Sequence, residues 1–185
     1  TAKCVSCAAA IAGSTITVAV LGQGVSEIAQ SAARIAGVSR VLVVDAAANA
    51  GPVATVLAPQ LVALVRQGSY SHVFGPSTTF GKDLMPRVAA LLDVPQVSDI
   101  MAVEAPKVFR RPIYAGNVII TIDVSDEPLI VGTVRTASFD TAAEGGTASV
   151  EALTLDTPVP AYARHVGLSS SASDRPDLQT ARRVV

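Results

Sequence analysis

Two cysteines three positions apart are the first residues that could carry chemistry. Cys4 and Cys7 form a single Cys-x-x-Cys pair, which is a redox dithiol when it opens a helix after a strand. No strand precedes this pair, no second pair completes a zinc site, and the flanking Ala and Val residues predict an amphipathic helix from Ala2 to Ile11. We interpret the cysteines as packing thiols, with an enzyme using a redox dithiol as an alternative.

Two glycine-rich stretches are candidate phosphate loops. In Gly75–Lys82, five residues rather than four separate the glycines, and Asp83 stands where Ser or Thr would bind magnesium. We interpret the hydroxyls of Ser77–Thr79 as caps of a following helix. Gly22–Gly24 follows a predicted strand but lacks the third glycine of a dinucleotide fingerprint, and Asp45 is the only acid that closes the next strand.

The remaining polar residues form no catalytic constellation. His72 and His165 have no Cys or acidic neighbour at ligand spacing, and no serine lies in a Gly-x-Ser-x-Gly elbow. The spacing defines no catalytic pair among the acids Asp83, Asp93, Asp99 and Glu104. The arginines that border the later strands could bind an anion, or could line a sheet rim and pair with nearby carboxylates. These are Arg110, Arg111 and Arg135.

The elements that must position these residues alternate in the first hundred positions. Short apolar strands are predicted at 15–21, 41–44 and 72–74, and helices at 26–36, 55–66 and 82–92. Such alternation predicts a parallel sheet covered by helices on both faces, because right-handed crossovers place them there. The predicted fold class is α/β, a three-layer α/β/α Rossmann-like domain.

The periodicity changes after Ser98. Apolar runs at 100–103, 117–122 and 129–134 have no helix between them, which predicts an added antiparallel section. Ser125–Pro128 predicts the turn of a hairpin between the last two runs. Residues 148–155 are expected to add one more strand.

The chain is expected to form one α/β domain over residues 1–165. The chain opens on a helix rather than a strand, so we expect the first strand of the sheet to be missing. Residues 166–185 are predicted to be a linker and the start of a further, truncated domain, with Arg182–Val185 opening another strand.

The composition excludes several classes of partner. Charged residues make up only 16% of the chain, against roughly 25% in average soluble proteins, which predicts extensive burial or a large interface. A net charge of −1 without a basic cluster argues against nucleic acid. No apolar stretch approaches the ~20 residues of a membrane-spanning helix, so no direct membrane insertion is expected.

Several blocks together resemble the electron-transfer flavoprotein α subunit family over nearly the whole chain. They are Phe80-Gly-Lys-Asp-Leu-Met-Pro-Arg-Val-Ala-Ala90, Val97-Ser-Asp-Ile100, Ile113-Tyr-Ala-Gly-Asn117, Val134-Arg-Thr-Ala-Ser-Phe139 and Ser173-Asp-Arg-Pro-Asp-Leu178. The resemblance implies an electron carrier rather than an enzyme. It implies an αβ heterodimer that passes electrons from acyl-CoA and other flavin dehydrogenases of fatty-acid and amino-acid oxidation to a membrane quinone oxidoreductase.

The resemblance also implies FAD in the full-length heterodimer, bound mostly by a later domain. Residues 166–185 would then be the linker and the start of this truncated flavin-binding domain. No catalytic, metal or FAD-binding residue is therefore assigned within this segment, and the FAD-contacting region is expected beyond Val185. The segment is expected to be scaffold and subunit interface with the β subunit. The implied location is the mitochondrial matrix in a eukaryote and the cytoplasm in a bacterium. A stand-alone adenine-nucleotide-binding module remains the main alternative.

Overall fold

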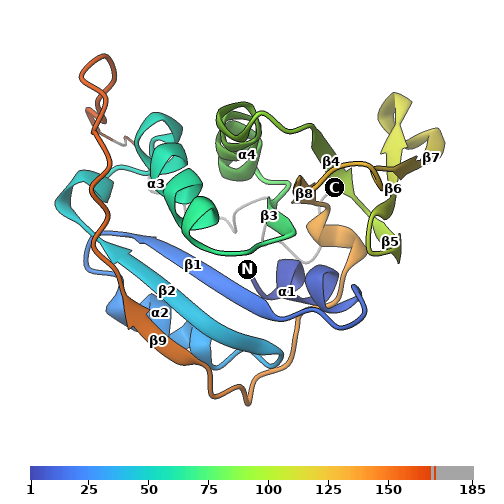
Figure 1. Ribbon diagram of the computed structural model, residues 1–185, viewed down its shortest axis with the longest axis horizontal. Coiled ribbons are helices and arrows are strands. Elements are labelled where there is room, and N and C mark those ends of the chain that lie inside the picture. The colour runs from blue at the N-terminus through green and yellow to red at the C-terminus, as the bar shows by residue number, and fades with distance from the viewer. Residues whose placement is uncertain (168, 170–185) are drawn as a thin grey trace.

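The computed structural model describes residues 1–167 and 169, which fold into the helices and strands of Figure 1. Their apolar residues recur at helical or strand spacing, as the sequence predicts. The helices are α1 (Ala2–Ala9), α2 (Ser26–Ala33), α3 (Ala54–Gln67) and α4 (Thr79–Leu92). The strands are β1 (Ile16–Gly22), β2 (Val38–Asp45), β3 (His72–Pro76), β4 (Gln96–Ile100), β5 (Ala102–Ala105), β6 (Val108–Ile113), β7 (Val118–Asp123), β8 (Ile130–Val134) and β9 (Ser149–Ala152).

The strands form three groups of three. Two groups are parallel, with the orders β1-β2-β9 and β3-β8-β4, and the third is antiparallel, with the order β5-β6-β7. The parallel register between β1 and β2 runs from Ile16 opposite Val38 to Gly22 opposite Asp45. The fold is therefore α/β with a mostly parallel strand arrangement and an added antiparallel section, as predicted.

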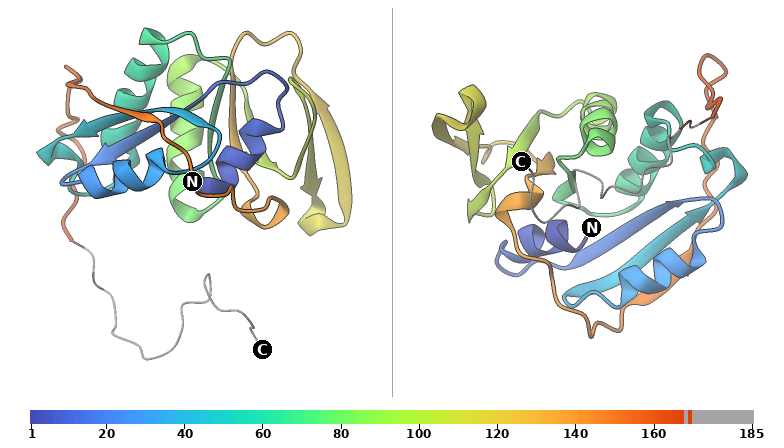
Figure 2. Two further views of the ribbon diagram at one scale, coloured as in Figure 1. Left: turned by 90° about the horizontal axis from the view of Figure 1, so that it is seen from below. Right: turned by 180° about the vertical axis from the view of Figure 1, so that it is seen from behind.

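The helices cover two opposite faces of the parallel strands (Figure 2). Helices α1 and α2 share one face, where Val5 and Ala29 pack with Val18, Val20 and Val41. Helices α3 and α4 share the other face. Its core combines Leu57, Ala58, Val62, Leu84, Met85, Val88 and Val131. Burial of these apolar side chains on both faces is the main stabilising contribution to a parallel sheet.

One expectation for the later strands is wrong. Residues 129–134 do not form an antiparallel hairpin with 117–122, because β8 lies between β3 and β4 and is parallel to both. The turn at Ser125 exists, with the Ser125 N–H donating to Asp123 Oδ1 at 2.9 Å. It leads into a different sheet. Every residue of β8 is buried, which is typical of a central parallel strand rather than the edge of a hairpin.

Two strands were not predicted from the sequence, and one predicted run is divided. Strands β4 and β6 lacked a predicted counterpart. The run 100–103 is split because β4 ends at Ile100 and β5 begins at Ala102. Asp99 has a φ of 58°, which bends the chain there. The expected strand at 148–155 is confirmed as β9, which pairs in parallel with β2.

The predictions for the end of the chain lie mostly outside the described residues. The block Ser173–Leu178 and the expected strand Arg182–Val185 belong to this part, as does most of the predicted linker. The proposed domain boundary near residue 165 stays a prediction.

Candidate functional site

The carboxyl ends of the parallel strands are the first place to look for a ligand site. In open α/β sheets, ligands bind in the crevice beyond these ends, often against the N-terminus of a helix. Here the relevant loops follow β1, β3, β4 and β8. They include the glycine turn Gly22–Gly24, the hydroxyls before α4 and Arg135, and Asp45 lies beside them at the end of β2.

The loop after β1 is closed by a carboxylate of the same chain. Asp45, at the end of β2, accepts hydrogen bonds from the Gly24 N–H at 2.9 Å and the Val25 N–H at 3.1 Å. These are the donors that precede α2, where a dinucleotide-binding fold would hold pyrophosphate. A negative charge already satisfies them, so this loop is poorly suited to a phosphate.

The loop after β3 is a helix cap, which confirms the interpretation from the sequence for Thr78, whereas the buried Ser77 hydroxyl has no hydrogen-bond partner among the described residues. Thr78 Oγ1 accepts from the Gly81 N–H at 3.4 Å at the start of α4. A Cβ added at Gly81 would lie 1.8 Å from the Pro76 carbonyl oxygen. Glycine at this position is therefore explained by the close approach of α4 to the end of β3, without a ligand.

A flavin dinucleotide would need open backbone donors at this edge of the sheet. Both loops that could cradle its phosphates are occupied by groups of this chain, namely the Asp45 carboxylate and the Thr78 hydroxyl. Arg135, just after β8, is also engaged within the chain, in an ion pair with Asp99. No step of flavin chemistry is therefore assigned to these residues.

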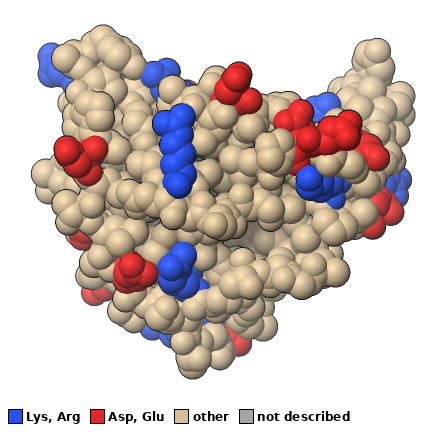
Figure 3. Space-filling model, viewed as in Figure 1, with Lys and Arg blue, Asp and Glu red and all other residues tan. Residues whose placement is uncertain are grey.

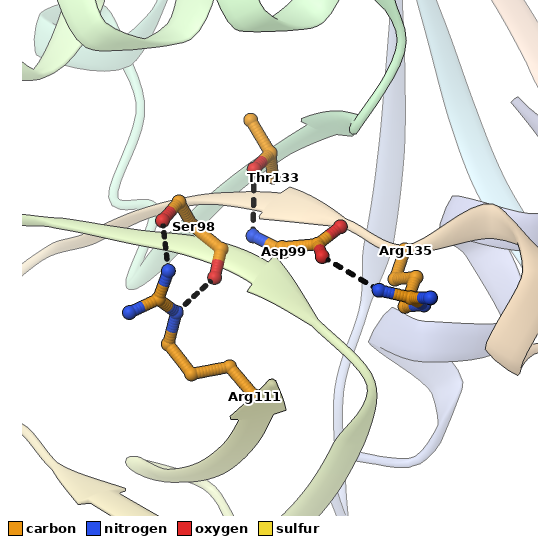
Figure 4. A network of polar contacts seen from close by, with 5 residues as sticks. All are labelled: Ser98, Asp99, Arg111, Thr133 and Arg135. Atoms are coloured by element: carbon orange, nitrogen blue, oxygen red, sulfur yellow. Dashed lines mark hydrogen bonds and ion pairs between the residues drawn. The ribbon is translucent and has the colours of Figure 1, made fainter. Parts of the chain in front are cut away.

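A polar network joins the antiparallel section to the parallel strands (Figure 4). Arg111 on β6 donates from Nε to the Ser98 carbonyl oxygen at 2.6 Å and from Nη2 to Ser98 Oγ at 2.9 Å. Two hydrogen bonds from one planar guanidinium fix both the distance and the orientation of β6 relative to β4. Arg111 thus has a positioning role.

The second half of the network centres on Asp99. Its backbone N–H donates to the hydroxyl of the buried Thr133 at 2.9 Å, and its carboxylate Oδ2 lies 3.0 Å from Arg135 Nη1. Its positive φ lies in the left-handed region, which Asp tolerates better than most residues. The network therefore holds β4 and β8 at the point where the chain turns out of the parallel sheet.

The three arginines interact with groups of this chain rather than forming an open anion site. Arg110 lies 3.6 Å from Glu104 in an exposed ion pair, while Arg111 and Arg135 belong to the network. The sequence analysis named both residues of the Asp99–Arg135 pair without predicting that they meet. It missed Ser98 and Thr133, of which only Thr133 has a signal, as a polar residue inside the otherwise apolar strand β8.

The cysteines have the properties of packing thiols. Both are free and buried in α1, and Cys7 has no exposed surface. Burial raises the pKa of Cys4, and burial together with the neighbouring Cys4 raises the pKa of Cys7 to about 12. A neutral buried thiol is a poor nucleophile and a poor redox centre, which argues against the dithiol alternative.

His72 is packed rather than poised for catalysis. Its ring lies against Phe74 and Phe109, and its Nε2 lies 2.6 Å from the Pro106 carbonyl oxygen. Burial lowers its pKa, although the hydrogen bond to Pro106 opposes this effect. His165 packs near Gly51, far from His72 in the sequence.

The described residues contain neither a metal-binding cluster nor a helix that could span a membrane. His, Cys, Asp and Glu side chains form no group of three that could hold a metal ion in residues 1–167. In the same part of the chain, no helix has the length and apolar character needed to cross a bilayer.

The most prominent feature of the surface is a set of exposed apolar side chains rather than a group of reactive ones. Tyr114, Val118 and Ile119, at one end of the antiparallel section, are 76%, 43% and 46% exposed. We call these three residues the β7 patch, although Val118 and Ile119, as consecutive strand residues, point to opposite faces of the sheet. Figure 3 shows that charged side chains are scattered over one face of the molecule, with wide uncharged areas between them. Exposed apolar clusters in a charge-poor surface are typical of protein–protein contacts.

Comparison with known proteins gives a consistent result. The family model "Electron transfer flavoprotein domain" matches residues 1–158. The chain is 47% identical over 181 residues to the electron transfer flavoprotein subunit alpha of Pseudomonas aeruginosa, with 96% of this chain and 57% of that protein covered. It is 44% identical over 185 residues to the subunit alpha of Paracoccus denitrificans, covering 100% and 58%.

The similarity extends to eukaryotes. The mitochondrial electron transfer flavoprotein subunit alpha of Dictyostelium discoideum is 36% identical over 198 residues, covering 100% of this chain and 56% of that protein. The chain thus spans between 56% and 58% of the length of these relatives.

Proposed function

The chain belongs to the electron transfer flavoprotein family, and from this premise we propose that it is the amino-terminal domain of an α subunit. Its role is scaffold and subunit interface in an αβ heterodimer that carries electrons. The observation that carries the proposal is the match of a family model to residues 1–158, joined to 47% identity with a bacterial α subunit.

The described residues support a scaffold rather than a catalyst. The candidate phosphate donors are occupied by Asp45 and Thr78, the thiols are buried, and the arginines interact within the chain. FAD is then bound by polypeptide beyond Val185, and no FAD-contacting residue is assigned here. The charge-poor composition, with 16% charged residues, suits a domain that packs on a β subunit.

The electron donors and acceptor follow from the family. The donors are flavin dehydrogenases, including acyl-CoA dehydrogenases and those of amino-acid oxidation, and the acceptor is a membrane quinone oxidoreductase. The location is the mitochondrial matrix in a eukaryote and the cytoplasm in a bacterium. Several eukaryotic relatives carry the word mitochondrial in their names, which supports the first of these.

The experiment is a comparison of the 185-residue chain with the full-length subunit, each coexpressed with the β subunit. We expect flavin absorption and reduction by an acyl-CoA dehydrogenase only with the full-length subunit. Stoichiometric flavin in the 185-residue protein would overturn the assignment of FAD to later residues. An absence of reduction by any flavin dehydrogenase, in a flavin-loaded full-length heterodimer, would overturn the carrier function.

A nucleotide titration tests the remaining alternative. We expect no binding of AMP or ATP by the 185-residue chain, since Asp45 fills the place of the pyrophosphate. Micromolar binding of either nucleotide would favour the adenine-nucleotide-binding module.

A further inference from the structure

The segment that follows β9 has no regular secondary structure but stays in contact with the domain. Figure 1 shows it running from β9 past the end of β2 toward α3. The Leu153 N–H donates to the Val43 carbonyl oxygen at 2.8 Å, which extends the ladder of β9 and β2 by one bond. Leu153 and Leu155 pack against the cluster that contains Leu42 and Val44. The segment is therefore firmly attached to β2 where it begins.

The next residues of the segment cover the carboxyl end of β2. Thr157 and Val159 line a small cavity of about 130 Å³ together with Asp45 and Gln60. The carboxyl ends of parallel strands are where open α/β sheets bind their ligands. In this protein the crevice beyond β2 is covered by the chain itself.

Two contacts hold the segment farther along. Arg87 on α4 donates from Nη2 to Tyr162 Oη at 2.6 Å. His165 lies directly over the buried Gly51, because a Cβ added at Gly51 would be 2.3 Å from the His165 Cβ. The absence of a side chain at Gly51 thus makes room for the segment just before α3.

These contacts are few for a segment of this length. Val159 and Tyr162 are 56% and 73% exposed, so little apolar area holds the segment beyond Leu155. Among the described residues, the bond from Arg87 to Tyr162 is the only hydrogen bond that residues 156–165 make. Segments with few buried contacts and few hydrogen bonds open locally while the rest of the domain stays folded.

We propose that residues 156–165 form a strap that docks over the carboxyl end of β2 and is latched by the hydrogen bond between Arg87 and Tyr162. The docked strap closes the cavity beside Asp45. The strap opens when the latch breaks, and it hinges next to Leu155, because Leu153 and Leu155 stay packed on β2. Asp45 and the strap then block two parts of the same crevice. The strap is independent of where flavin binds, since every contact that defines it lies within the described residues.

Tryptic cleavage after Arg164 reports the open strap, because a protease needs a locally unfolded segment. In the full-length α subunit coexpressed with the β subunit, Tyr162→Phe removes the latch. We expect it to speed this cleavage roughly fivefold, the effect of one hydrogen bond, without lowering the melting temperature. The matched control is Tyr70→Phe, which removes the hydrogen bond that Arg40 donates to another tyrosine at 3.1 Å and should leave the cleavage rate unchanged. Equal cleavage rates for Tyr162→Phe and the wild type would overturn the proposal.

Amide hydrogen exchange of Gly51→Ala gives an independent readout. The added Cβ forces His165 away, so exchange over residues 157–165 should increase at least ~threefold. Gly167→Ala is the matched control, since a Cβ at Gly167 meets no atom within 4 Å. Unchanged exchange in Gly51→Ala would contradict the docking of the strap. Faster exchange throughout the domain would also contradict it, because the effect would then be a general loss of stability.

Discussion

At Asp45, one carboxylate takes the place that a pyrophosphate occupies in dinucleotide-binding folds of similar architecture. Its two oxygens accept from consecutive backbone N–H groups, those of Gly24 and Val25. The carboxylate therefore stabilises the start of α2, as an N-cap residue does, although it comes from the next strand. The same contact removes the donors that a nucleotide would need.

Asp45→Ala should destabilise the protein by about 1 kcal/mol, because the change removes both acceptors at the start of α2. Asp45→Asn keeps one side-chain oxygen, so the loss should be smaller. The urea midpoints of the two variants measure the difference. AMP should bind to neither variant, and AMP binding that appears in Asp45→Ala would reveal a nucleotide site masked by the carboxylate.

The buried thiol of Cys7 makes the free energy of unfolding depend on pH in the alkaline range. Its pKa is raised from 9.0 to about 12 in the fold, so the folded state retains the proton that the unfolded state releases. This stabilisation is complete below pH 9 and is lost as the pH rises toward 12, by at most about 1.4 kcal/mol per pH unit. The free energy of unfolding of the wild type should therefore fall over this range.

The control for this prediction is Cys7→Ala. The variant should be less stable at pH 7 by about 1 kcal/mol, because it deletes a fully buried atom. It should then lose less stability than the wild type between pH 9 and pH 12, since tyrosines and lysines titrate equally in both proteins. Parallel pH profiles would contradict a raised pKa of Cys7.

At the scale of elements, the antiparallel section depends on a few polar contacts with the parallel strands. Arg111 joins β6 to Ser98 on β4 through two hydrogen bonds, and Asp99 joins β4 to Thr133 on β8. Phe109, also on β6, is fully buried in the core beneath α1. The section is thus anchored by Phe109, with the partly buried Val103 and Ile122 packed against the same core, and oriented by the guanidinium of Arg111.

Arg111→Lys should destabilise the protein by about 1–2 kcal/mol, because a single ammonium nitrogen lacks the planar pair of N–H donors that the guanidinium directs at Ser98. Amide exchange should increase in β5 and β6 in particular. The adjacent Arg110→Lys is the matched control, since its exposed pair with Glu104 at 3.6 Å contributes little. Equal effects of the two substitutions on the thermal unfolding midpoint would contradict the positioning role of Arg111.

For the whole molecule, the exposed apolar area is the feature that connects structure with the proposed role. The β7 patch lies at the end of a rigidly held antiparallel section. Apolar and aromatic side chains contribute most of the binding energy at the centre of protein interfaces. A domain that serves as scaffold in a heterodimer needs such a surface.

Ile119→Asp in the full-length α subunit should weaken its association with the β subunit at least tenfold, about 1.4 kcal/mol. The melting temperature of the isolated α subunit should change little, because Ile119 is 46% exposed. Val150→Asp on β9, at a residue 39% exposed, is the matched control. Titration of labelled β subunit measures both affinities, and equal affinities would exclude the β7 patch from the interface.

The sequence by itself determined the types of most elements and the family. Apolar runs between Gly-rich turns predict the parallel strands β1, β2 and β3, and helical spacing predicts α2, α3 and α4, because these signals depend on residues close together in the chain. The cap at Thr78 and the packing role of the cysteines could be predicted for the same reason. The blocks from Phe80 to Phe139 identified the family.

Only the tertiary structure decided which elements became neighbours. The local sequence pattern does not show that β8 lies between β3 and β4 rather than beside β7, because an apolar run of this length is compatible with either position. The structure shows that β8 pairs with β3 and β4 and that all its residues are buried. The contact of Asp45 with Gly24 and the pairing of Asp99 with Arg135 join residues 21 and 36 positions apart. Such contacts form because folding brings together segments that are distant in the sequence. A short window of sequence therefore does not predict them.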